Sequence, residues 1–187
     1  NDRFGNTNSA YSFDGIDDHI SIPTDSFLLN EYTYSLWAKP SSMPSSGTYR
    51  SPFSIGHTGG SQFILLSNDA SNSNVGWAGG GSENNTTAVD VETGTLPNTN
   101  QWYHLAITRT NSAYRLYIDG SLIGTTQHSG LPAGYTNIPE GSIGSRRNFH
   151  QFFHGDIDDI KVFNCTLSAN EIMDIYESEM VTNIAIN

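Results

Sequence analysis

The densest group of potential metal ligands in this sequence is an acidic turn near its N-terminus. Asp14, Asp17 and Asp18 lie close together around Gly15. Calcium ions in proteins take roughly six to eight oxygen ligands, which carboxylates and backbone carbonyls supply. The same aspartates can also serve a structural purpose, because short acidic side chains cap turns by accepting backbone N–H bonds. The spacing is therefore compatible both with a calcium site and with a self-capped turn.

A second group of residues is typical of carbohydrate recognition. Trp77 lies within Gly76–Gly81, a segment that contains no other bulky side chain. A tryptophan in such surroundings can present a flat apolar face to a sugar ring, since the indole combines a large apolar body with a polar edge. Packing of Trp77 in the core is the alternative. The candidate contacts beside it are Tyr49, Arg50 and His57.

Positive charge is concentrated in one short segment, which reads RRNFHQ at residues 146–151. Arginine guanidinium groups bind carboxylates and sulfates through paired hydrogen bonds. Arg146, Arg147 and His150 therefore extend the predicted saccharide site and would suit an anionic glycan. The alternative is that the two arginines neutralise aspartates of the same chain.

Glycoside hydrolysis needs two carboxylates that face each other, about 5–5.5 Å apart in enzymes that retain configuration. The nearest candidates are Asp90 and Glu92, which share a face because they are two residues apart on a predicted strand. The third carboxylate of the known glucanase pattern is absent, since Gly94, Thr95 and Leu96 follow. No nucleophile elbow for a catalytic serine occurs either. We therefore predict that the chain is not an enzyme.

The strands that position these residues are predicted by strict alternation of side chains. In Trp102–Arg109, successive residues would face opposite sides of a sheet. The strand that follows ends at Asp119-Gly120, which suits the positive φ angles of a two-residue hairpin turn. Tyr32–Lys39 alternates in the same way. Trp37 and Trp102, which lie in these strong patterns, are predicted to be largely buried.

The rest of the chain continues this pattern of short strands and turns. A bulge near Asp158-Asp159 is predicted, because the apolar residues of Gly155–Phe163 are unevenly spaced. Ser168 and Glu171 have the spacing of a capping box, which predicts a short amphipathic helix after the last strand. The fold predicted is all-β: a two-sheet antiparallel jelly-roll sandwich with one short C-terminal helix, forming a single domain over residues 1–187.

The composition excludes several classes of partner. The net charge is −11, with 8 basic and 19 acidic residues. Such a surface disfavours nucleic acid, whose phosphates need a basic partner, and it also disfavours anionic membranes. No apolar run is long enough to insert into a membrane, and none has the character of a signal peptide. We expect the chain to begin after a signal or to be one module of a longer secreted protein.

Four segments together resemble the laminin-G-like domains of the concanavalin A-like lectin/glucanase superfamily. They read AYSFDGIDDHISI (10–22), YTYSLWAKP (32–40), WYHLAIT followed by YRLYIDGSLIG (102–124), and GDIDDIKVFNCTLSANEIMDIY (155–176). The resemblance implies a concanavalin A-like jelly roll and, as in related modules, a structural calcium ion that joins the N-terminal strand to the last strand. By similarity to that last strand, Asp158 would be a calcium ligand, and we take Asp14 and Asp17 as its partners.

The same fold hosts lectins, glycan-binding modules, adhesion domains, glycoside hydrolases and polysaccharide lyases. Within this range we expect a non-catalytic carbohydrate-binding module of a secreted or cell-surface multidomain protein. Its partners would be a poly- or oligosaccharide and other domains of the same chain. The alternatives are a protein-binding adhesion domain and a glycoside hydrolase or polysaccharide lyase with an unfamiliar site.

Overall fold

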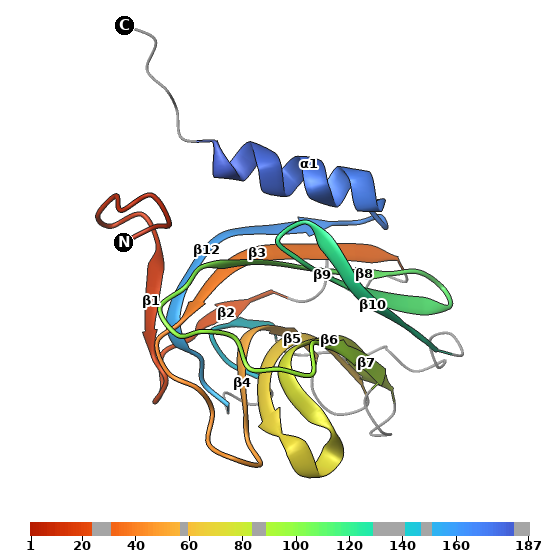
Figure 1. The fold of residues 1–187 in the computed structure, drawn as a ribbon, viewed down its shortest axis with the longest axis horizontal. Coiled ribbons are helices and arrows are strands. Elements are labelled where there is room, and N and C mark those ends of the chain that lie inside the picture. The colour runs from red at the N-terminus through yellow and green to blue at the C-terminus, as the bar shows by residue number, and fades with distance from the viewer. Residues whose placement is uncertain (24–30, 57–59, 84–88, 129–140, 147–150, 182–187) are drawn as a thin grey trace, which may run out of the picture.

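The computed structural model describes residues 1–23, 31–56, 60–83, 89–128, 141–146 and 151–181. In these residues, the strands form two six-stranded antiparallel sheets that stack face to face (Figure 1). One helix lies at the C-terminal end of the described chain. The predicted two-sheet sandwich with a short terminal helix is therefore confirmed.

The chain crosses between the two sheets several times, so strands distant in sequence are neighbours in each sheet. The first sheet has the order β1 (Tyr11–Asp14), β12 (His154–Phe163), β3 (Tyr32–Pro40), β8 (Tyr103–Arg109), β9 (Ala113–Ile118) and β10 (Ser121–Gln127). The second sheet has the order β2 (Ile20–Ile22), β11 (Gly141–Ile143), β4 (Tyr49–Ile55), β5 (Gly60–Asp69), β6 (Asn74–Glu83) and β7 (Val89–Glu92). The short turn η1 (Ala70–Asn72) links β5 to β6, and helix α1 spans Ala169–Met180.

The core lies between the sheets and is filled by every second residue of the central strands. Tyr34 and Leu36 of β3 are fully buried there, as are Ile64 and Leu66 of β5. Apolar burial of this kind contributes roughly 25 cal/mol for each Å² removed from water. Because side chains alternate along a strand, the intervening residues point to the outer faces of the two sheets. Those outer faces are where a site can form.

Three local predictions are confirmed by the backbone. Asp119 has a φ of 49°, as the hairpin turn between β9 and β10 requires. The pairing of β12 with β3 shifts between Asp158 and Lys161, which is the predicted bulge. Ser168 and Glu171 form a complete capping box at the start of α1. Each of these features depends on local chemistry, which explains why the sequence reveals it.

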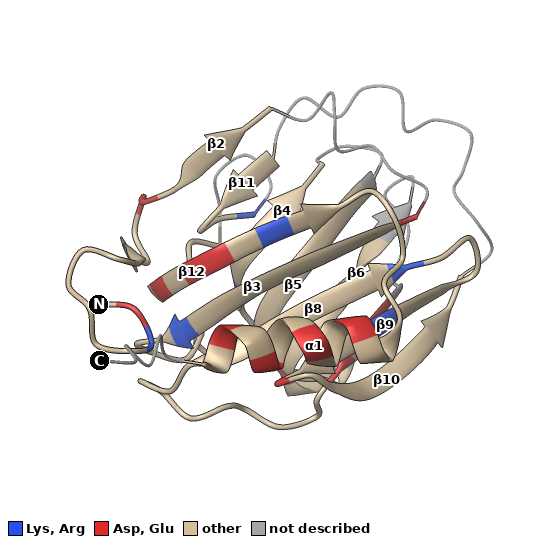
Figure 2. Ribbon diagram, turned by 90° about the horizontal axis from the view of Figure 1, so that it is seen from above, with Lys and Arg blue, Asp and Glu red and all other residues tan. Residues whose placement is uncertain are grey.

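Helix α1 lies across the outer face of the first sheet (Figures 1 and 2). Ile172 is fully buried against apolar residues of β8 and β9. Trp37 of β3 is 2% exposed on this face; its ring stacks on Tyr176 at a centroid distance of 5.8 Å, and its Nε1 donates to Glu179 Oε2 at 2.6 Å. The predicted burial of Trp37 is confirmed. Among the described residues, no helix has the length and apolar character needed to cross a membrane.

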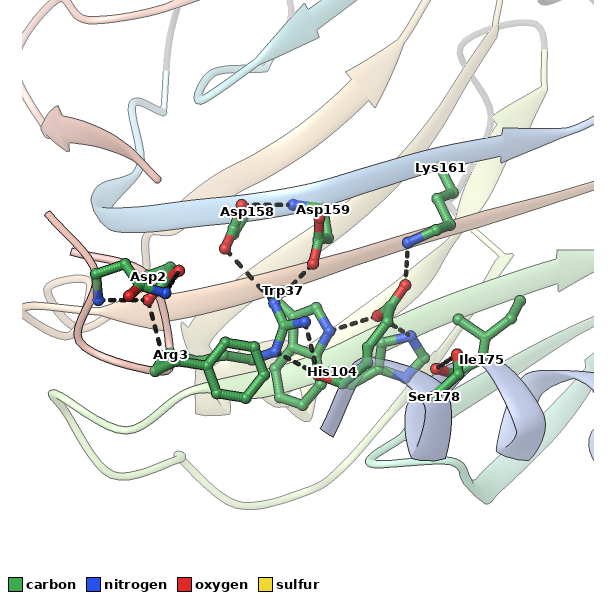
Figure 3. A network of polar contacts seen from close by, with 12 residues as sticks. Asp2, Arg3, Trp37, His104, Asp158, Asp159, Lys161, Ile175 and Ser178 are labelled. Atoms are coloured by element: carbon green, nitrogen blue, oxygen red, sulfur yellow. Dashed lines mark hydrogen bonds and ion pairs between the residues drawn. The ribbon is translucent and has the colours of Figure 1, made fainter. Parts of the chain in front are cut away.

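Arg3 ties the N-terminal segment to the helix and to β12, as Figure 3 shows. Its Nε and Nη2 donate to the backbone oxygen of Glu179 at 3.0 and 2.7 Å. Its Nη1 lies 2.7 Å from Asp159 Oδ2 and 3.5 Å from Asp158 Oδ2. The guanidinium also lies over the ring of Trp37, 4.6 Å from its centroid. Segments from both ends of the chain are therefore held together on this face.

His104 is fully buried beneath the same helix, and its Nε2 lies 2.8 Å from the hydroxyl of Ser35. Burial, together with the positive charges of Lys161 and Arg3, lowers the pKa of His104 to about 4. Glu179 lies 3.9 Å from Nε2, but its carboxylate already forms an ion pair with Lys161. His104 is therefore neutral at neutral pH.

Acidification should destabilise the fold through His104. The pKa of His104 is lowered in the folded state, so between about pH 6.5 and pH 4 the unfolded chain binds a proton that the folded chain resists. The free energy of unfolding should fall by on the order of 3 kcal/mol across this range, since each pKa unit corresponds to about 1.4 kcal/mol. Urea unfolding at several pH values checks this expectation.

The matched control is His104→Gln, which keeps a polar side chain but does not titrate. Both proteins share every other titrating group, so the stability difference between parent and variant should narrow as the pH falls. Parallel pH profiles for the two proteins would contradict the role assigned to His104.

Candidate functional site

A row of side chains crosses the outer face of the second sheet at one register position. Residues directly opposite each other in antiparallel strands share a face. The neighbours of the row on β4 and β5 point into the core between the sheets, so the row points away from that core. Ser142, Ser54 and Phe63 are nevertheless buried, at 5%, 2% and 0% exposed. We call it the outer-face row, and its members in order from β11 to β7 are Ser142, Ser54, Phe63, Gly80 and Asp90.

Arg146 packs on this row. Its guanidinium lies over the ring of Phe63, 4.4 Å from the centroid, and the residue is 8% exposed. Burial raises the pKa of Asp90, and the positive charge of Arg146 opposes that shift. The hydroxyl groups of Ser142 and Ser145 lie 2.5 Å apart. The guanidinium of Arg146 thus contacts the Phe63 ring and influences the carboxyl group of Asp90, which lies further along the same row.

Tyr49 belongs to the same outer face. It packs against the apolar cluster that contains Phe63 and Leu65. Its hydroxyl donates to Asp69 Oδ2 at 2.7 Å, and the hydroxyl of Ser71 donates to Asp69 Oδ1 at 2.5 Å. The structure thus brings Tyr49 and Arg146, two predicted ligand contacts, to one cluster. Phe63, which they share, was not foreseen, although its alternation with buried isoleucine and leucine on β5 is the signal that marks it as outward-facing.

Trp77 does not belong to this surface, and the prediction that it forms an exposed platform is wrong. It is 1% exposed, and its ring lies in the core beside Tyr103 and Phe153, at centroid distances of 6.0 and 6.4 Å. The glycines around Trp77 were expected to leave its ring exposed, but at least Gly79 instead allows close packing of the two sheets. A Cβ atom on Gly79 would lie 2.8 Å from Cδ1 of Ile107, so this glycine makes room for a side chain of the other sheet. Trp77 is buried by neighbours that are distant in sequence.

The remaining predicted contacts are not assembled at the outer-face row. Arg50 pairs with Leu66, a core residue, and its Nη1 packs on the turn at Gly15, 2.8 Å from where a Cβ atom would lie. Burial lowers the pKa of Arg50. Three predicted contacts lie outside the described residues: His57, Arg147 and His150.

The acidic turn between β1 and β2 has the properties of a self-capped turn and also those of a cation site. Asp14, Asp17 and Asp18 are exposed, and each offers a carboxylate oxygen within 4.8 Å of the others. Asp14 Oδ1 accepts the backbone N–H groups of Ile16 at 2.8 Å and Asp17 at 3.3 Å, and the first of these bonds is the main cause of the lowered pKa of Asp14. The turn caps itself and still leaves carboxylate oxygens for a cation.

Asp158 lies apart from this turn, so the predicted ligand set of Asp14, Asp17 and Asp158 is not assembled. Asp14 pairs with His154, which is four residues before Asp158 on β12, or about 13 Å along a strand. Asp158 instead faces Arg3, and burial is the main cause of its raised pKa. The resemblance identified the strand, but the register of that strand against β1 decides which residue reaches the turn.

Asp90 and Glu92 are the two carboxylates that the sequence offered for hydrolysis. They pair with Gly80 and Ala78 on β6 and share the outer face. Burial raises the pKa of both, and the charge of Asp90 raises that of Glu92 further. Raised pKa values in a carboxylate pair are also a property of glycosidase sites, so this pair is the place to test for catalysis.

The chain belongs to the concanavalin A-like lectin/glucanases superfamily, since residues 14–173 match the profile of its laminin-G branch. This match covers most of the sandwich, including the outer-face row and the acidic turn. A search of curated protein sequences finds no match.

Solved structures with the same fold include carbohydrate-binding domains. Domain 4 of AbnA, a GH43 extracellular arabinanase from Geobacillus stearothermophilus in complex with arabinotriose, is 21% identical over 89% of this chain and 76% of that chain, with a TM-score of 0.65. The Ruminococcus gnavus IT-sialidase CBM40 bound to α2,3-sialyllactose is 16% identical over 89% and 97%, with a TM-score of 0.66. A heptameric SAP-like pentraxin from Limulus polyphemus is 16% identical over 88% and 80%, with a TM-score of 0.62. These likenesses confirm the fold.

Replacement of Trp77 should therefore act on stability. Trp77→Ala removes a large side chain from the core and should lower the free energy of unfolding by about 3–5 kcal/mol. Tyr49→Phe keeps the aromatic ring, removes the hydroxyl that bonds Asp69, and should cost about 1 kcal/mol. Urea unfolding of both variants measures the difference, and a Trp77 variant as stable as the Tyr49 variant would contradict the core position.

Proposed function

We propose that this chain is a non-catalytic carbohydrate-binding module of a secreted or cell-surface protein, and that the saccharide binds at the outer-face row. The observation that carries the proposal is the guanidinium of Arg146 over the ring of Phe63, with Asp90 and serine hydroxyl groups beside it. Ligand sites for small polar molecules combine an apolar surface with a few fixed polar groups. The sugar ligands of the two bacterial neighbours support a saccharide over other classes of ligand.

The polar side chains that pack beside the row support binding, because they are held in place before a ligand arrives. Arg146 is held by its ring contact and Tyr49 by its bond to Asp69. Gly80 contributes no side chain between Phe63 and Asp90. Groups that are already ordered lose little conformational entropy on binding, which favours affinity.

The positive charge of Arg146 should raise the affinity of the site for an anionic saccharide relative to a neutral one. Arabinotriose and α2,3-sialyllactose serve as a neutral and an anionic probe in calorimetry. If the glycan is anionic, Arg146→Ala should weaken binding by about tenfold or more, since loss of a charge-assisted hydrogen bond costs roughly 1.5–3 kcal/mol. Arg146→Lys should restore part of the affinity, because an ammonium keeps the charge but not the planar fork of donors.

The control is Arg115→Ala, which removes the same charge from β9 on the other sheet. It should leave binding unchanged. Failure of a wide glycan panel to bind would contradict carbohydrate binding and favour the adhesion alternative. Release of reducing ends from a bound polysaccharide, lost in Asp90→Asn or Glu92→Gln, would contradict the non-catalytic assignment.

We also propose that calcium binds at the acidic turn and stabilises the folded state. The three carboxylates of Asp14, Asp17 and Asp18 are exposed, which favours a weak site of the kind found in extracellular modules. At a calcium concentration about 100-fold above the dissociation constant, the gain in stability would be about 2.7 kcal/mol. The melting temperature should therefore rise in millimolar calcium relative to EDTA.

Two matched variants locate the ion. Asp17→Asn should remove the calcium response, because it takes one carboxylate from the turn. Asp158→Asn should retain the response, because Asp158 faces Arg3 and is distant from the turn. Identical melting curves of the parent in EDTA and in calcium would refute the proposal, and loss of the response in the Asp158 variant would place the ion elsewhere.

A further inference from the structure

A cleft of about 460 Å³ lies on the other side of the sandwich, where the N-terminal segment and α1 meet the outer face of the first sheet. Its volume is in the range of small-molecule sites. Four aromatic side chains line it: Phe4, Trp37, Trp102 and Tyr176. The polar groups among its walls include Asp119 and Gln101. The proposed saccharide site on the second sheet makes no use of this cleft.

Trp102 contributes an aromatic ring to the wall of this cleft. It was predicted to be largely buried; it directly precedes β8 and has intermediate exposure, so part of it is accessible. The ammonium of Lys39 lies 5.1 Å from its ring centroid. Phe4 is 38% exposed. A ligand can therefore reach aromatic surface in the cleft.

Asp119 supplies a fixed carboxylate to the cleft. Its backbone N–H donates to the carbonyl of His104 at 2.9 Å, and its Oδ1 accepts the N–H of His104 at 2.9 Å. Its second oxygen, Oδ2, has no hydrogen-bond or ion-pair partner among the described residues. Burial raises the pKa of Asp119, and its charge contributes to the raised pKa of Tyr176. A partly buried carboxylate thus lines an aromatic cleft without a counter-ion from the described part of the chain.

The rings of this cleft already bind a cation of the protein itself. The guanidinium of Arg3 lies 4.5 Å from the centroid of Phe4 and 4.6 Å from that of Trp37. Its charge is balanced by Asp158 and Asp159, whereas Asp119 forms no ion pair with any residue that the structure describes. The helix beside the cleft is rich in acidic residues (Figure 2). The uncompensated charge of the cleft is therefore negative.

We propose that the cleft binds an organic ammonium ion on an apolar body, with the ammonium at Asp119 and the body against Trp102 and Tyr176. Aromatic faces attract cations, and the attraction grows when the cation is desolvated. A buried carboxylate is also stabilised when a hydrogen-bonded positive charge joins it. Amino sugars and lysine side chains both carry an ammonium group on a body with apolar C–H surface. The experiment therefore compares an amino sugar with a lysine derivative.

The test titrates the protein, labelled with ¹⁵N, with a glucosamine trisaccharide and separately with Nα-acetyl-lysine amide. The indole N–H signal of Trp102 should shift and saturate with at least one probe, whereas that of Trp77 in the core should not. Acetylation of the probe's amine removes the charge and should abolish the shift. Asp119→Asn keeps the acceptor for the His104 N–H group and should weaken binding by about tenfold.

Asp174→Asn on the exposed side of α1 is the charge-matched control and should bind as the parent does. Affinity should also fall as the pH is lowered through the pKa of Asp119. Arg146→Ala should bind both amines normally, so failure of the saccharide site leaves this proposal intact. Absence of a saturable Trp102 shift with both amines, equal binding of the acetylated probes, or an unaffected Asp119→Asn variant would each overturn it.

Discussion

Burial of apolar side chains between the two sheets is the interaction on which the rest of the structure depends. Once Ile64 and Leu66 are enclosed, alternation sends Phe63 and Leu65 to the outer face of the second sheet. The same rule holds on β3, where enclosure of Leu36 turns Trp37 outward beneath the helix. The pattern of core residues thereby determines which side chains lie on the two outer faces.

The two outer faces differ in which parts of the chain cover and order their side chains. On the second sheet, hydrogen bonds and ring contacts within the face hold Tyr49 and Arg146. On the first sheet, α1 and the N-terminal segment close over the strands, joined by the bonds of Arg3 to Glu179. This second arrangement makes the cleft a product of both chain ends, because its walls include Phe4 and Tyr176.

The electrostatics of the faces suit different ligands. The outer-face row sets a guanidinium near the partly buried carboxyl group of Asp90, which gives paired charges suited to a polar saccharide. The cleft sets the unpaired carboxylate of Asp119 among aromatic rings, which suits a positive group. Membership of a superfamily that hosts many functions does not by itself choose between such surfaces.

Features that arise from residues close together in the chain can be predicted from the sequence: the alternating strands, the turn at Asp119, the capping box at Ser168 and hence the sandwich. The accessibility of each aromatic ring and the pairing of charges depend instead on contacts between distant parts of the chain. Trp77 is buried because Tyr103 and Phe153 come from distant strands, whereas Trp102 lines a cleft at a strand end. Asp158 faces Arg3 because strand register, which is set by pairing across the whole sheet, carries it away from the acidic turn.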